Sequence, residues 1–187
     1  MARPLSEDKR HAILQAATQL FAGEGLGAST ARIAKLAGVS EGTVFTYFSN
    51  KDELMNQLYL DLKRGLREAL VLPPDRLPLR DTLWLAWQAY VGWGIAYPLA
   101  YQALAKLALA PNITAATRAQ AAADFCEVGN LLQTAMAGGI LRHQSADFVG
   151  ALLGAMANTT MEFMARTPEA APQLCADGFA AFWKAIA

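Results

Sequence analysis

One glycine in the first quarter of the chain most constrains what the chain can fold into. Gly38 can adopt the left-handed backbone of a tight turn without a Cβ clash. Ala34, before it, is small enough for two helices to cross closely, and Val44, ten residues after Ala34, falls on the inward face of the next segment. This spacing predicts a helix-turn-helix arrangement, whose second helix presents its other side to solvent or DNA.

Hydroxyl and apolar side chains around this turn support the interpretation. Ser29 or Thr30 can N-cap the first helix and Ser40 can cap the second, because each hydroxyl accepts a hydrogen bond from a free backbone N–H. Upstream, Ser6 and the two acids after it predict the start of an earlier helix, which two glycines end. A three-helix head is therefore expected over about residues 6–48. The residues expected to share its core are Ile33, Ala37, Val44 and Phe48.

A long amphipathic helix is predicted directly after this head. Ser49 or Asn50 precedes Lys51, and leucine then recurs at every fourth position. This spacing predicts a linking helix over residues 51–70 with one apolar stripe. The leucines are Leu54, Leu58, Leu62, Leu66 and Leu70.

The run from Ile33 to Leu54 resembles the signature of the TetR family of bacterial transcriptional regulators. The matching residues are Ile33-Ala34, Ala37-Gly38-Val39-Ser40, Gly42-Thr43, Tyr47-Phe48, Lys51 and Leu54. Two residues depart from the pattern: Phe45 stands where the family more often has Tyr, and Glu41 stands where a basic residue is frequent. At the level of motifs the resemblance covers about residues 6–60, and beyond it only the helical layout and the length agree.

Composition and resemblance together predict an all-α protein of about nine helices. Apolar residues make up 54% of the chain, and no long stretch alternates apolar and polar residues as a strand would. The resemblance implies a helix-turn-helix DNA-binding domain at residues 1–50. It also implies a helical ligand-binding and dimerisation domain at residues 51–187. Because the sequence has no internal repeat, low-complexity tract or Ser/Gly linker, the two domains are expected to be joined rigidly through residues 51–70.

Prolines and glycines divide the second domain into predicted helices. Leu72-Pro73-Pro74 closes the linking helix, and Pro98 ends or kinks the helix after it. The remaining helices are predicted from Leu79 to Tyr97, from Leu99 to Leu109, from Thr114 or Thr117 to Ala137, from Ser145 to about Arg166, and from Pro168 or Pro172 to the end of the chain.

The outward side of the second helix of the turn is expected to contact DNA. Thr43 and Thr46 can offer a hydroxyl or a methyl group to base edges, and Phe45 can contact a thymine methyl. By resemblance, Thr43, Tyr47 and Lys51 hold phosphates, although Tyr47 can also be a core residue. Arg3 is expected in an arm that reaches a minor groove. The full set expected at DNA is Ser29, Thr30, Arg32, Ser40, Glu41, Gly42, Thr43, Phe45, Thr46, Tyr47 and Lys51.

Charge does not favour nucleic acid in this head. Residues 1–54 hold as many acids as bases, so DNA binding must depend on where individual charges point.

Aromatic and methionine side chains are concentrated in the second domain. Such side chains line typical small-molecule cavities, and methionine repacks around varied guests. The alternative is an ordinary core, because an aromatic stripe at helical spacing also packs there. The residues expected at a ligand are Trp84, Trp87, Tyr90, Trp93, Tyr97, Tyr101, Phe125, Met136, Met156, Asn158, Glu162 and Phe163.

Two stripes near the end of the chain suggest a dimer seam. One consists of small residues that permit close approach, and the other is apolar with little chain left to cover it. The alternative is that both stripes pack within one subunit. The residues expected at the interface are Gly150, Gly154, Ala157, Met161, Cys175, Phe179, Phe182 and Trp183.

Several other classes of protein are disfavoured. Cys126 and Cys175 are expected to be small apolar core residues, and no metal site, cofactor site or catalytic motif is found, so no enzyme is expected. The polar start of the chain predicts a cytoplasmic protein. Residues 82–105 carry no charge, but glycines, glutamines and Pro98 interrupt them, so a buried helix is expected there rather than a membrane span.

The function predicted from these features is regulation of transcription through sequence-specific binding to a double-stranded DNA operator. The favoured form is a homodimeric repressor that a small hydrophobic or aromatic effector releases from its operator. The alternative is a DNA-binding regulator without such a ligand, controlled by a protein partner. Repression is favoured over activation only by the family resemblance.

Overall fold

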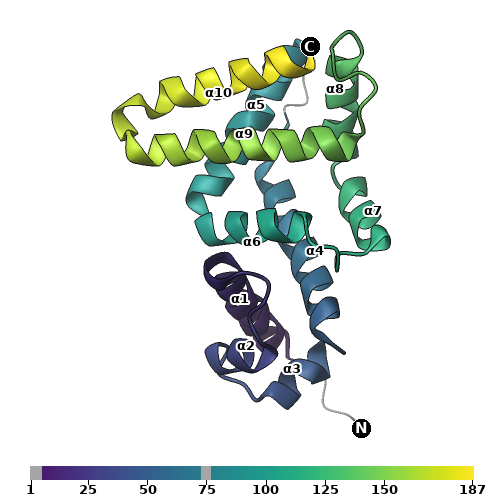
Figure 1. The fold of residues 1–187 in the computed structure, drawn as a ribbon, viewed down its shortest axis with the longest axis vertical. Coiled ribbons are helices and arrows are strands. Elements are labelled where there is room, and N and C mark those ends of the chain that lie inside the picture. Colours follow the sequence, from purple (N-terminus) through teal and green to yellow (C-terminus); the bar gives the residue numbers. More distant parts are fainter. Residues whose placement is uncertain (1–5, 73–76) are drawn as a thin grey trace. The chain divides into compact units, whose positions relative to one another are not determined.

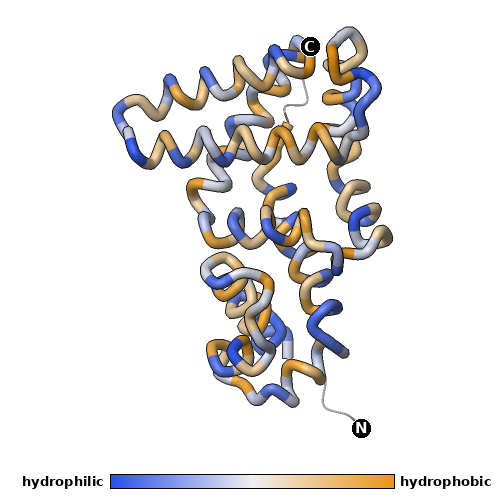
Figure 2. Tube along the Cα trace, in the orientation of Figure 1, coloured by the Kyte–Doolittle hydropathy of each residue, from blue (hydrophilic) through white to orange (hydrophobic). Residues whose placement is uncertain are grey.

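The computed structural model describes residues 6–72 and 77–187, and over these residues the chain forms ten α-helices and one short 3-10 helix (Figure 1). These residues contain no strand, so the all-α prediction is confirmed. Arg3 and the Pro73-Pro74 pair lie outside the described residues. Figure 2 shows hydrophobic and hydrophilic positions interleaved along the helices, as expected when each helix buries one side.

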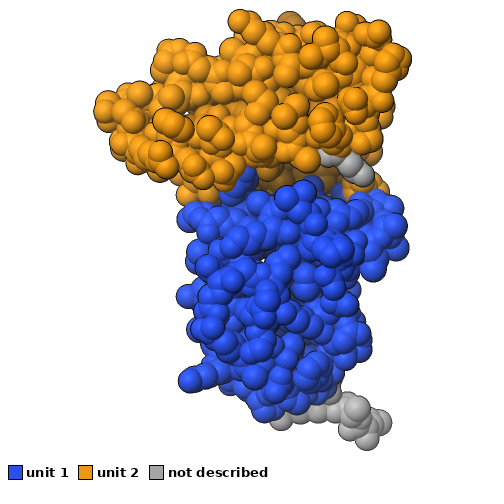
Figure 3. Space-filling view, in the orientation of Figure 1, with its two compact units in different colours: residues 1–65, 97–121 blue, residues 66–96, 122–187 orange. Residues whose placement is uncertain are grey.

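Contacts divide the chain into two compact units (Figure 3). Unit 1 comprises residues 1–65 and 97–121, and unit 2 comprises residues 66–96 and 122–187. The linking helix α4, Lys51–Ala69, contributes residues to both units.

Unit 1 begins with the predicted three-helix head. Its helices are α1 (Glu7–Glu24), α2 (Thr30–Leu36) and α3 (Glu41–Tyr47). Gly25 and Gly38 have positive φ values of 91° and 69°, the left-handed backbone that ends α1 and that turns the chain between α2 and α3.

Serine side chains cap both short helices of the turn. The Ser29 Oγ accepts a hydrogen bond from the Arg32 amide at 3.3 Å, and the Ser40 Oγ accepts one from the Thr43 amide at 3.1 Å. The core that holds these helices together contains Ile13, Ile33, Val44, Phe48 and Leu54, each at most 2% exposed. Ala37 was expected there as well, but it is only half-buried.

Two further helices complete unit 1. They are α6 (Pro98–Ala108), which packs against α1, and α7 (Ala115–Ala123). The Lys106 ammonium donates hydrogen bonds to the backbone carbonyls of Phe21 and Ala22 at 3.1 and 2.5 Å. These carbonyls belong to the last turn of α1, where a cation is favourable because helix C-termini carry partial negative charge.

Unit 2 packs one helix against a helical hairpin. Its helices are α5 (Leu79–Ala96), α8 (Cys126–Met136), α9 (Ala146–Arg166), the 3-10 helix η1 (Pro168–Ala170) and α10 (Ala171–Ile186). Figure 1 shows α9 and α10 running back along one another. At their crossing a Cβ on Gly178 would collide with the Thr160 side chain and lie 3.0 Å from Trp87. Close packing of α10 therefore requires glycine at this position.

The prediction of one continuous helix from Thr114 or Thr117 to Ala137 is wrong. The chain turns at residues 124–125, where the Phe125 amide bonds back to the Ala122 carbonyl at 3.0 Å. The Arg67 Nε donates a hydrogen bond to the Asp124 carbonyl at 2.9 Å. A distant side chain thus satisfies the backbone group that a continuous helix would have bonded internally. Pro98, in contrast, marks the break between α5 and α6 as predicted.

Candidate nucleic-acid interface

The outward side of α3 presents the side chains predicted to contact bases. Glu41, Gly42 and Thr46 are exposed and Phe45 is 46% exposed, whereas Val44 on the opposite side is 1% exposed. A Cβ on Gly42 would meet only the Ser40 hydroxyl, at 3.9 Å, so the start of α3 has free space around it. One side of this short helix is therefore exposed to solvent and the opposite side is buried in the head.

Two half-buried hydroxyl groups on α3 already have partners inside the chain. The Tyr47 phenolic oxygen accepts a hydrogen bond from the Ser6 amide at 2.9 Å, and the Thr43 Oγ lies 2.8 Å from the Ser40 Oγ. Since the Ser6 contact uses Tyr47 as an acceptor, the phenolic hydrogen is left to donate to another group, such as a phosphate oxygen.

Other residues predicted to lie at DNA have acidic partners. Arg32 forms an ion pair with Glu24 that includes a hydrogen bond of 2.6 Å, and their side chains are 60% and 39% exposed. An ion pair this exposed contributes little stability, so a phosphate can replace Glu24 at low cost. The Thr30 hydroxyl donates to the Glu41 carboxylate at 2.6 Å, which ties the start of α2 to the start of α3.

Lys51 is the first residue of α4, the helix that follows α3. It is half-buried, and its ammonium lies 5.9 Å from the centre of the Phe21 ring. Asn50 caps this helix by accepting from the Glu53 amide at 2.8 Å, and Glu53 accepts in return from the Ser49 amide. The hydrogen bond from the Ser49 hydroxyl and, to a smaller extent, the one from the Ser49 amide lower the pKa of Glu53 below its ordinary value.

The residues predicted to line a ligand site are spread over both units. Tyr97 and Tyr101 belong to unit 1, whereas the other predicted ligand residues belong to unit 2. Tyr97 is 60% exposed and Phe163 is 48% exposed. Asn158 donates to the Glu162 carboxylate at 2.9 Å on the surface of α9, so each satisfies the other. The other predicted ligand residues are buried or half-buried. They are Trp84, Trp87, Tyr90 and Trp93 on α5, Tyr101 on α6, Phe125 at the start of α8, Met136 on α8 and Met156 on α9.

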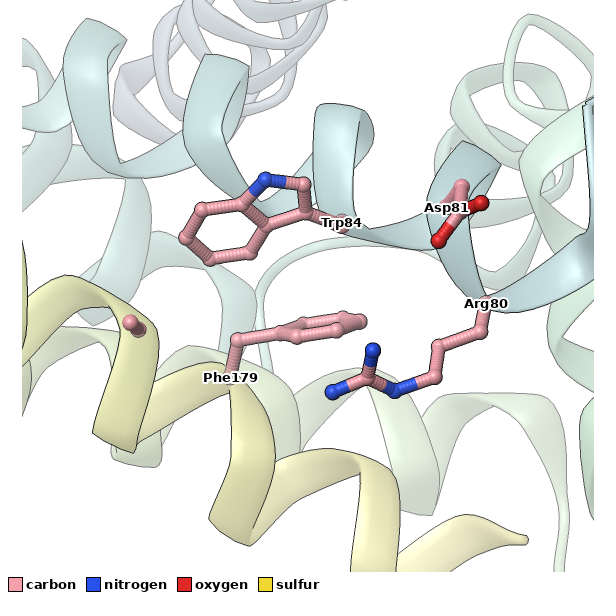
Figure 4. A pocket seen from close by; sticks show the side chains of 5 residues that line it. Arg80, Asp81, Trp84 and Phe179 are labelled. Atoms are coloured by element: carbon pink, nitrogen blue, oxygen red, sulfur yellow. The ribbon is translucent and has the colours of Figure 1, made fainter.

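Trp87 is a core residue of unit 2. Its ring stacks on Phe182 at 5.8 Å, and its indole N–H donates to the Cys175 carbonyl at 3.1 Å. A cavity close to it is lined by Trp84, the α5 residues Arg80 and Asp81, and the α10 residues Ala176 and Phe179 (Figure 4). Sequence reasoning missed Arg80 and Asp81. The available signal was the four-residue spacing of Arg80 and Trp84, which places both on one side of a helix.

The expectation that the apolar stripe on the last helix lacks a cover is wrong. Cys175, Phe179 and Phe182 are at most 9% exposed, because α5 covers them within the chain through Trp84 and Trp87. Burial raises the pKa of the Cys175 thiol, as expected for a core cysteine, whereas Cys126 is exposed, contrary to prediction. Of the remaining predicted interface residues, Ala157 and Met161 are buried, Gly154 and Trp183 are half-buried, and Gly150 is exposed.

Over the described parts of the chain, no group of acidic, histidine or cysteine side chains is arranged to hold a metal ion. Within those same ranges, no helix is both long and apolar enough to cross a membrane.

Comparison with known proteins assigns the head to a family. Residues 13–58, which include α2, α3 and the turn at Gly38, match the family model described as bacterial regulatory proteins, tetR family. A solved structure of a candidate tetR family transcription regulator from Shewanella sp. PV-4 has a TM-score of 0.80 with this chain. It is 28% identical and covers 95% of this chain and 97% of its own. The head of the chain therefore matches the TetR family, and a solved structure of that family has the same fold over nearly the whole chain.

Two curated relatives each match about a third of this chain. The uncharacterized HTH-type transcriptional regulator YhgD of Bacillus subtilis (strain 168) is 38% identical over 65 residues, which is 34% of each chain. The HTH-type transcriptional regulator HbdR of Aromatoleum sp. (strain CIB) is 43% identical over 63 residues, which is 33% of this chain and 26% of HbdR. The match therefore spans about a third or less of these relatives' length.

Proposed function

We propose that this TetR-family protein is a sequence-specific DNA-binding regulator of transcription. The single observation that carries the proposal is the exposed side of α3, held outward by a buried Val44 and a glycine turn. A helix of this kind enters a major groove, and its exposed Thr46 and Phe45 side chains would meet base edges.

Phosphate contacts would come from groups at the edges of this helix. Tyr47 retains a hydrogen-bond donor beyond its contact with Ser6, and Lys51 supplies a cation at the start of α4. Thr43 and Ser29 add hydroxyl groups near the two helix starts, and Thr30 would add a third by giving up its hydrogen bond to Glu41. Such contacts position the head on DNA, and base contacts then provide the specificity.

The proposed working form is a homodimer, because one helix-turn-helix head reads too few base pairs to select a site. Exposed apolar residues on α9 support a surface for a second copy. Phe148 and Phe163 are 50% and 48% exposed, and the small residues Ala151 and Ala155 lie exposed between them. Burying such a patch against its own copy removes apolar surface from water. Gly150 belongs to the same helix and is also exposed.

The proposed mode of action is repression relieved by a small hydrophobic or aromatic effector, in the cytoplasm where the operator DNA is available. In one arrangement of the dimer the two heads cannot bind the operator together. An effector that binds this arrangement more tightly than the DNA-binding one shifts the population toward it. Strong release requires a preference of about 10²–10⁴-fold for that arrangement. The alternative is a protein partner in place of a small-molecule effector, and the experiment below distinguishes between the two.

The test is a gel-shift titration of the full chain with the DNA upstream of its own gene. The double variant Thr43→Ala, Tyr47→Ala should lose at least about tenfold in affinity, since two phosphate contacts are removed. The matched control Gln133→Ala, an exposed residue of α8, should bind as tightly as the unaltered chain. Unchanged affinity in the double variant would refute the assigned interface, and release by hydrophobic compounds alone would support the effector over the protein partner.

A further inference from the structure

A small cavity lies in unit 2, where the first turn of α5 faces the middle of α10 (Figure 4). We call it the Arg80 cavity. Its volume is about 140 Å³, and it is lined by Arg80, Asp81, Trp84, Ala176 and Phe179. For comparison, a cavity of about 150 Å³ in another protein holds one benzene molecule. Arg80 and Asp81 are exposed side chains, so the Arg80 cavity is a hollow open to solvent rather than an enclosed void, and a single aromatic ring is about the size of group that it can hold.

The apolar wall of the cavity is aromatic. The Trp84 and Phe179 ring centres are 5.1 Å apart with planes tilted by 54°, so no third ring fits between them. Phe179 is 3% exposed and is covered by Trp84, Trp87 and Arg80. Trp84 is only half-buried, so part of its indole surface remains available to a ligand ring lying alongside.

The polar wall supplies an oriented cation. The Arg80 guanidinium carbon lies 5.6 Å from the centre of the Phe179 ring, which holds the flat guanidinium against an aromatic surface. Within the described residues this guanidinium forms no ion pair. A guanidinium held near a ring by a cation–π contact keeps its N–H groups for planar acceptors, and a carboxylate is the planar anion that it binds through two parallel hydrogen bonds.

Asp81 adds a negative charge to the same cavity. Its carboxylate also lines the cavity, and Figure 4 shows it apart from the Arg80 guanidinium. A bound anion is therefore attracted by Arg80 and repelled by Asp81, so removal of each charge should change the affinity in opposite directions.

We propose that the Arg80 cavity binds a small planar aromatic carboxylate of benzoate size. The ring lies against Trp84 and the carboxylate accepts two hydrogen bonds from Arg80. The inference gives a chemical class to the effector of the proposed function and rests on that function for its effect on DNA. Binding itself is measured without DNA.

The test is calorimetric titration of the full chain with benzoate and with benzamide, which has the same ring but no charge. Benzoate should bind saturably and at least about tenfold more tightly than benzamide, because the charge-assisted pair is lost with the amide. Arg80→Gln should weaken benzoate binding to the level of benzamide. Asp81→Asn should strengthen it by about threefold or more, since a nearby like charge is removed.

Arg166→Gln is the matched control. Arg166 also places its guanidinium over a ring, that of Phe163 at 5.3 Å, but it lies on α9 outside the cavity. Its substitution should leave benzoate affinity unchanged. Equal affinities for benzoate and benzamide, the same loss in both arginine variants, or no saturable binding below about 10 mM would overturn the proposal. Failure of the operator gel shift with intact benzoate binding would instead refute the proposed function and leave the cavity assignment standing.

Discussion

The backbone amide of Ser6 donates a hydrogen bond to the phenolic oxygen of Tyr47 at 2.9 Å, joining the start of α1 to the end of α3. The bond connects residues 41 positions apart in the chain. Because the phenolic oxygen is the acceptor, the same hydroxyl can donate to a DNA phosphate. Under the proposed function, Tyr47 would therefore contact both the start of α1 and a DNA phosphate.

Tyr47→Phe should lower operator affinity by about five- to tenfold, because it removes one hydrogen bond to a charged phosphate. The variant should also unfold at a lower temperature, since the Ser6 amide loses its acceptor. Gel shift and thermal melting measure the two effects.

Ser6→Pro separates these two roles of Tyr47. Proline removes the amide donor but leaves the Tyr47 hydroxyl, and the Ser6 side chain makes no capping hydrogen bond that would be lost with it. DNA affinity close to that of the unaltered chain is expected. An equal loss in Ser6→Pro and Tyr47→Phe would mean that the hydroxyl acts only by positioning α1.

Gly38→Ala should destabilise the protein by about 1–2 kcal/mol, although no atom lies within 4 Å of the added Cβ. The cost comes from the backbone alone, because φ is 69° at this turn. Gly42→Ala is the matched control: it has no positive φ, and it should be neutral or stabilising by up to about 1 kcal/mol because alanine favours a helix. Thermal unfolding followed by circular dichroism measures both. A higher melting temperature for Gly38→Ala than for Gly42→Ala would contradict the role assigned to the turn.

Lys106→Met should destabilise unit 1 by about 1 kcal/mol, because two carbonyls at the end of α1 lose a charged donor. Lys184→Met, on an exposed position of α10, is the control and should change stability by less than about 0.5 kcal/mol. Urea unfolding provides the comparison. Equal stabilities of the two variants would show that the Lys106 contacts contribute nothing.

The carboxylate of Glu53 predicts a pH dependence. Its pKa is lowered in the folded chain from an ordinary value of 4.5, so the folded state favours the charged form. The stabilisation is therefore present above that value and is lost as pH falls through the lower folded pKa. Glu53→Gln should be less stable than the unaltered chain at pH 7, by a small amount because the group is exposed to solvent. The difference in melting temperature should shrink as the pH falls below 4.5, and a difference that stays constant from pH 7 into this acidic range would refute the assignment.

The local pattern of the sequence determined the head and its family. Gly38, the serine caps and the spacing from Ala34 to Val44 act over a few residues, so turn and helices follow from local physical rules. The break near Pro98 is local for the same reason, because proline lacks an amide hydrogen. The stripe of leucines likewise predicted α4 without knowledge of its neighbours.

Tertiary structure decided which apolar surfaces are covered and which polar groups meet. The apolar stripe of Cys175, Phe179 and Phe182 was expected to be uncovered, but α5 covers it. Trp87 of α5 and Cys175 are almost ninety positions apart in the chain. The break between α7 and α8 depends on Arg67, and the Arg80 cavity depends on where Phe179 falls. Helical periodicity shows that a side of a helix is apolar. It does not identify the partner, because burial is a property of the packed chain.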